Sequence, residues 1–185
     1  MLMSSEYWLR GPVAGIPAAL QPVAHALLQS RDEVNALMEG FPEEKLWERP
    51  AGVASPGFHL QHLAGVLDRL LTYARGEMLS PRQLEELAGE GRSGGVGGNE
   101  SGPGSGAGEL ARLLERYNSQ VNNALLQLAG TPESSLTEPR GVGRARIPST
   151  VGGLLFHAAE HSMRHTGQLL VTIKILSTDI ASGNR

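Results

Sequence analysis

Apolar residues recur every three or four positions along four stretches of the chain, and this spacing predicts four long helices. The apolar face of the first stretch is formed by Ile16, Leu20, Val23, Leu27, Val34 and Leu37. That of the third is formed by Leu110, Leu113, Leu114, Tyr117, Val121, Leu125 and Leu128. Because no stretch of comparable length alternates between apolar and polar residues as a strand does, we expect an all-α fold.

Capping residues and helix breakers place the helices near residues 14–39, 55–75, 109–129 and 150–176. Ser55 is placed to cap the second helix with its hydroxyl, and Gly130 to end the third. Ser149 or Thr150 is placed to cap the fourth. A further short helix is expected at "SPRQLEELAG", after the second long one.

Residues 91–107 between the second and third long helices are rich in glycine and serine. They offer too little apolar surface to offset the entropy of ordering them, so we expect a flexible crossover loop. A phosphate-binding glycine loop would follow a strand and end in a GK[ST] sequence, which is absent here. Four helices with one long connection predict a four-helix bundle, as a single domain over residues 1–185.

The composition excludes several classes of partner and of chemistry. Nineteen acidic against sixteen basic residues give a net charge of -3 with no basic stripe, which argues against a nucleic-acid partner. No apolar run reaches the roughly 18 residues of a membrane span and no signal-peptide pattern opens the chain, so we expect a cytoplasmic protein. The absence of cysteine excludes thiolate ligands and a protein thiol nucleophile, so any sulfur chemistry needs an external thiol.

Candidate chemistry lies in "HAAEHSMRHTGQ", where His157, His161 and His165 stand four residues apart. Residues four apart on a helix are about 6 Å apart along its axis, so two such imidazoles can share one ion. His157 and His165 are separated by roughly 12 Å of rise, whereas nitrogens on one zinc ion lie within about 4 Å of each other. At most two of the three should therefore bind the same ion.

These histidines follow the apolar face of the fourth helix, so they are expected to point into the bundle, where each needs a polar partner. A core histidine satisfied by one hydrogen bond is the simpler interpretation. A metal ion would need a further ligand, and the second helix offers His59 and His62. His25 has no histidine neighbour and is expected to be structural or exposed.

A competing motif overlaps these residues. "HAAEH" matches the H-x-x-E-H pattern of inverted zinc peptidases, with His157 and His161 as ligands and Glu160 as the base. Such peptidases need another acidic ligand well downstream, and only Asp179 follows. Glu160 is also rotated by ~100° from His161, so it is expected to face a neighbouring helix or solvent rather than the ion.

Three segments, "EEKLWERPAG", "SPGFHLQHLAG" and "LLFHAAEHSMRHTGQLL", resemble the DinB-like (YfiT-like) superfamily of metal-binding bundles. The resemblance implies a four-helix bundle, often a homodimer, with His62, His161 and His165 as metal ligands and His59 and His157 outside the coordination shell. The chain departs from the family at Thr166, where arginine is common, and in its long glycine-rich insertion.

Three neutral histidines on a divalent ion, with zinc or nickel expected, leave coordination positions open, as in catalytic sites. A thiol bound there loses its proton near neutral pH. Since some relatives in the resembled superfamily are thiol S-transferases or thiol-dependent isomerases, we expect transfer of a low-molecular-weight thiol to an electrophilic small molecule. Hydrolysis by metal-activated water and a non-catalytic, stress-related metal-binding bundle remain the alternatives. No catalytic residue is assigned.

Other polar and aromatic residues have two interpretations each. Gln168 either orients a ligand or makes an interhelical hydrogen bond. The arginines at positions 140, 144 and 146 are expected to be solvated loop charges, with attraction of an anionic thiol as the alternative. Trp47 is expected to pack in the core rather than at a pocket mouth.

Overall fold

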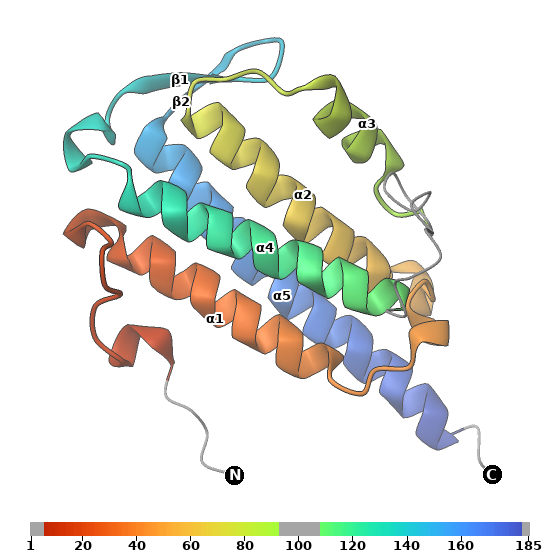
Figure 1. Cartoon of the computed structure of the whole chain (residues 1–185). Helices are drawn as coiled ribbons and strands as arrows, with labels where there is room; N and C mark the ends of the chain where they lie inside the picture. The colour runs from red at the N-terminus through yellow and green to blue at the C-terminus, as the bar shows by residue number, and fades with distance from the viewer. Residues whose placement is uncertain (1–5, 93–107, 183–185) are drawn as a thin grey trace.

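The computed structural model describes residues 6–92 and 108–182. Figure 1 shows a bundle of long helices with a hairpin at one end. The elements are α1 (Gln21–Met38), α2 (Pro56–Ala74), α3 (Pro81–Gly89), α4 (Glu109–Ala129), β1 (Pro139–Val142), β2 (Ile147–Thr150) and α5 (Val151–Ser182). The expected helical bundle is confirmed, and α3 occupies the segment where a short helix was expected. From residue 93 onward, the loop expected at 91–107 lies outside the described residues.

Each long helix packs against two others: α1 and α2 both contact α4 and α5. Their shared interior contains fully buried side chains such as Leu27, Leu63, Tyr117 and Leu169. Burying one leucine stabilises the fold by about 1.5–3 kcal/mol, so the apolar faces predicted from spacing hold the bundle together. No helix in the described ranges is both long and apolar enough to cross a membrane.

The helix ends agree with those expected from the sequence, except at the start of the first helix and at the end of the fourth, where α5 continues to Ser182 instead of ending near residue 176. The Ser55 hydroxyl accepts a hydrogen bond from the Phe58 amide at 3.2 Å, and the Thr150 hydroxyl accepts one from the Gly153 amide at 3.0 Å. The expected start of the first helix near residue 14 is wrong, because α1 begins at Gln21. Gly15 has a left-handed φ of 77°, which interrupts a helix, and residues 18–20 form only a 3-10 turn.

The β1–β2 hairpin was not expected from the sequence. Its strands pair antiparallel, with Val142 opposite Ile147, and four residues per strand are too few to show alternation. The Arg140 side chain donates a hydrogen bond to the Ala74 carbonyl, which fastens the hairpin to the end of α2. The hairpin therefore covers the end of the bundle where α2 finishes and α5 begins (Figure 1).

Candidate metal centre

Packing of α2 against α5 brings His62 next to His161 and His165. One ring nitrogen from each of these residues lies within 4.8 Å of the other two. The Nε2 atoms of His62 and His161 are 2.9 Å apart, within the roughly 4 Å expected of two nitrogens on one ion. The pairing of His161 with His165 across one helical turn is one of the two that the spacing allows, the other being His157 with His161.

A carboxylate fixes the tautomer of His62. Its Nδ1 lies 2.7 Å from Glu90 Oε2, and Arg69 donates to Glu90 Oε1 at 2.6 Å. Burial raises the pKa of Glu90, but the hydrogen bonds from His62 and Arg69 outweigh it and lower that pKa. A charged carboxylate only accepts hydrogen bonds, so in the neutral form of His62 Nδ1 carries the proton and the Nε2 lone pair faces the cluster.

His59, His161 and His165 are neutral near pH 7. Burial, reinforced by repulsion from His62 when that imidazole is protonated, lowers the pKa of both His59 and His165 to about 4. The same causes, in the same order, lower the pKa of His161. Neutral imidazoles keep the lone pairs that a metal ion requires, so the donor set fits a divalent cation.

His59 lies outside the three-histidine cluster but touches it, since its Nδ1 is 3.1 Å from His165 Nδ1. The Phe58 ring stacks on His62, with 5.4 Å between centroids and 9° between planes. Phe58 therefore forms an apolar wall against the cluster. Within the described structure, the second ring nitrogen of His161, Nδ1, is buried without a hydrogen-bond partner.

His157 does not point into the bundle, and that expectation is wrong. Its side chain is 48% exposed and its Nδ1 lies 3.2 Å from Glu160 Oε2. Eight residues of α-helix turn through about 800°, which leaves His157 rotated by ~80° from His165 and away from α2. Arg164 also pairs with Glu160, so this carboxylate is engaged on the surface of α5.

His157, Glu160 and His161 nevertheless form a second group close enough to hold an ion. It shares His161 with the first group and corresponds to the H-x-x-E-H motif. The further acidic ligand which that motif requires, Asp179, has a side chain outside the described part of the chain. The two groups make opposite predictions for His157 and His165, which mutation can separate.

Glu90, Arg69 and Gln61 support the site but were missed from the sequence. Gln61 accepts a hydrogen bond from the Gly91 amide at 2.8 Å and donates one to the Arg92 carbonyl at 3.0 Å. With the Glu90 contacts, these bonds bind the segment after α3 to α2. The buried polar side chains of Gln61 and Arg69 on α2 were the available signal, but their partners at residues 90–92 lie about twenty or more positions away in sequence.

Thr166, the departure from the family pattern, takes part in a buried chain of hydrogen bonds. Its hydroxyl donates to the Ser162 carbonyl at 2.9 Å. Since each hydroxyl has one proton, Ser30 must donate to Thr166 at 2.7 Å and Tyr117 to Ser30 at 2.6 Å. With 1% of Thr166 exposed, this position faces the centre of the bundle and leaves no room for arginine.

The other candidate residues lie outside the three-histidine cluster. Trp47 packs partly buried against the core and donates to Glu109 at 3.0 Å, as the core interpretation predicted. Arg140 binds the Ala74 carbonyl, about 18 Å of helix rise from His62, and Arg146 shares a hollow with it beside Gly76, so neither lies at the cluster.

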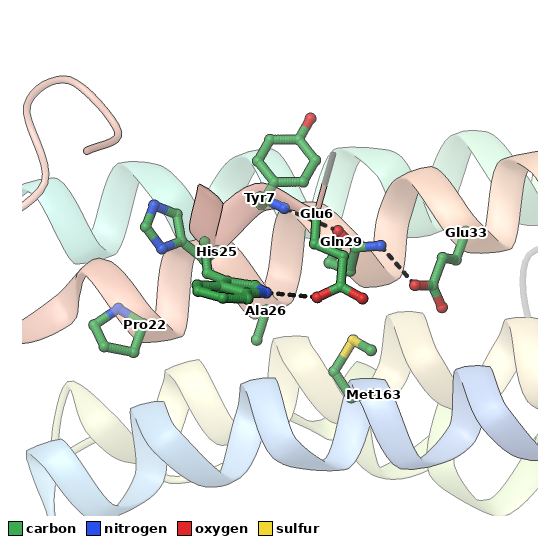
Figure 2. Close-up of a pocket in the computed structure, with 9 residues that line it drawn as sticks. Glu6, Tyr7, Pro22, His25, Ala26, Gln29, Glu33 and Met163 are labelled. Carbon is green, nitrogen blue, oxygen red and sulfur yellow. Dashed lines mark hydrogen bonds between the residues drawn. The ribbon is translucent and has the colours of Figure 1, made fainter. Parts of the chain in front are cut away.

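His25 lines a separate hollow between the N-terminal segment and α1, together with Tyr7, Pro22 and Met163 (Figure 2). Its Nε2 lies 3.0 Å from the Gly11 carbonyl, so it has a structural partner.

The family model of the DinB superfamily matches residues 26–169, which include His62, His161 and His165. A search of curated proteins finds no match to the chain.

Proposed function

The chain belongs to the DinB superfamily, and from this premise we propose that it is a metal-dependent enzyme that transfers a low-molecular-weight thiol to an electrophilic small molecule. The convergence of His62, His161 and His165 in a chain without cysteine carries the proposal. In the described part of the chain the group comprises three imidazoles, and three protein ligands with an open position are typical of catalytic rather than structural metal sites. The proposed ion is zinc or nickel.

The residues of the chain have defined roles in this proposal. A divalent ion held by the three histidines would supply an open position at which a thiol loses its proton near neutral pH. Glu90 orients His62, and burial keeps His161 and His165 neutral so that their lone pairs stay available. Phe58 shields the His62 ring from water on one face.

Metal analysis of protein purified without an affinity tag or added metal tests whether the three histidines bind an ion. Alanine at His62, His161 or His165 should abolish stoichiometric metal binding. His157→Ala and His25→Ala should retain it, because neither belongs to the proposed ligand set. The H-x-x-E-H interpretation predicts that His157→Ala loses the ion and His165→Ala keeps it.

Cobalt substitution tests whether the bound ion takes up and deprotonates a thiol. Titration of the cobalt protein with a small biological thiol should produce intense near-ultraviolet cobalt–sulfur absorption together with proton release. Consumption of an electrophile should require both thiol and metal, and should be lost in His161→Ala. Turnover without thiol would instead support hydrolysis. Absence of thiol binding and of turnover in fully metallated protein would support a non-catalytic bundle.

A further inference from the structure

A groove of about 570 Å³ lies beside the three-histidine cluster, between α5 and the segment that precedes α2. Its lining includes Val53 and Ala54 from that segment, His59 of α2, and Gly167, Gln168 and Val171 of α5. None of these residues belongs to the proposed ligand set.

His59 connects this groove to the cluster. Only 3% of His59 is exposed, so it forms part of the inner lining, and its Nδ1 lies 3.1 Å from His165 Nδ1. A molecule in contact with His59 is therefore separated from a proposed metal ligand by one imidazole ring. The groove is close enough to the cluster to hold a reactant.

Gly167 has no structural reason to be glycine. It lies inside α5, where glycine destabilises a helix relative to alanine. Its φ is outside the left-handed region, and an added Cβ would meet nothing within 4 Å. At Gly57, by contrast, the Trp47 ring lies 2.8 Å from such a Cβ, so packing there requires glycine. The absence of a side chain at position 167 leaves the edge of the groove open.

The chemical character of the lining points to one class of ligand. Val53 and Val171 are 45% and 57% exposed and form apolar walls. The Gln168 side chain lies exposed at the groove, and no hydrogen bond joins it to the described part of the chain. The positive charge of Arg164 at the rim is offset by its pair with Glu160. An uncharged, mainly apolar molecule with a hydrogen-bonding group such as a carbonyl matches this lining.

We propose that this groove binds the electrophilic substrate, an uncharged and mainly apolar carbonyl compound, and that Gly167 sets the size it accepts. This assignment rests on the proposed thiol transfer and names the second reactant. Gln168 donates to the carbonyl, and the two valines cover the apolar part.

Prodan, an uncharged fluorescent naphthalene ketone, tests the groove directly in metal-free protein. The wild-type chain should bind it saturably, with a blue-shifted emission. Gly167→Leu should weaken binding by about tenfold, because the added side chain occupies the space of the ligand. Ala111→Leu adds the same side chain to an exposed position of α4 and should bind prodan as the wild type does.

Equal prodan binding by Gly167→Leu and the wild type would overturn the proposal, as would an equal loss in Ala111→Leu. If Gly167→Leu fails to fold, Val171→Asn removes an exposed apolar wall instead and should weaken binding in the same direction. A second copy of the chain is the other possible occupant of the groove. In that case the wild-type chain would sediment as a dimer without binding prodan, and Gly167→Leu would sediment as a monomer. This result would also overturn the proposal.

Activity then separates this proposal from the transfer reaction. With electrophiles of increasing apolar size, Gly167→Leu should lose kcat/KM most for the largest and still bind metal. Loss that is uniform across sizes would contradict the size limit while leaving thiol transfer intact. Prodan binding without any thiol-dependent turnover would contradict the transfer reaction while leaving the groove in place.

Discussion

Glu90 Oε2 lies 2.7 Å from His62 Nδ1, and these residues are 28 positions apart in the sequence. The carboxylate stands just after α3 and the imidazole within α2, so the short helix is connected to the centre of the candidate site. Arg69 holds the second carboxylate oxygen, which fixes the direction of the carboxylate. Carboxylates in this position orient metal-binding histidines and raise their basicity.

Glu90→Gln should therefore weaken metal binding by about 10–100-fold, because the amide keeps the shape but loses the charge that supports His62. Competition with a chromophoric chelator measures this affinity. Glu86→Gln, which removes a carboxylate of α3 that pairs with Arg116, is the matched control and should leave affinity unchanged. Equal affinity in Glu90→Gln and the wild type would show that the contact does not act on the ion.

Gly65→Ala should weaken metal binding through the same contact. A Cβ at position 65 would lie 2.5 Å from Glu90 Oε1 and 2.6 Å from Arg69 Nη1, so both side chains must move away. Because these are flexible side-chain ends, the helix should stay folded, as circular dichroism can check. Combining Gly65→Ala with Glu90→Gln should weaken affinity little more than either change alone, since both act on one interaction. Additive losses would mean that Gly65 acts independently of Glu90.

Gly167→Ala should stabilise the protein by about 0.5–1 kcal/mol in urea denaturation, because alanine favours the helix and its Cβ meets no atom. Gly57→Ala makes the same change in α2 but places its Cβ 2.8 Å from the Trp47 ring, so it should destabilise. Destabilisation by Gly167→Ala would mean that the space around position 167 is filled in solution.

Titration of Tyr117 should lower the free energy of unfolding as the pH rises above about 10. Burial raises the pKa of Tyr117 to about 12, against an ordinary value of 10. The folded state therefore favours the protonated phenol, whose contribution is complete below about pH 10 and is lost as pH rises to about 12. The loss should be of the order of 3 kcal/mol.

Urea denaturation of wild type and Tyr117→Phe across this pH range measures the effect, since phenylalanine cannot titrate. The variant should be less stable near pH 7, by about 1 kcal/mol for the lost hydrogen bond, yet change less between about pH 10 and 12. Parallel pH profiles for the two proteins would contradict the assignment.

The sequence by itself determined the helices, since their apolar spacing and caps are local properties. Ser55 and Thr150 cap the predicted helices because each hydroxyl reaches an amide three residues away. The relation of His161 to His165 is also local, because one helical turn sets their separation. The segments around His62 and His165 were sufficient to identify the family. The β1–β2 hairpin was not predicted, because its strands are too short to show a periodic pattern.

Only the tertiary structure decided what surrounds these histidines. Which of His59 and His62 meets His161 depends on the rotation and depth at which α2 packs on α5, and periodicity does not fix these values. The outward rotation of His157 follows from the same packing. Glu90 reaches His62 because a separate short helix returns to α2, and the groove at Gly167 exists because the segment containing Val53 lies against α5. Such contacts join residues far apart in sequence, and their geometry is set by the packing of the whole bundle.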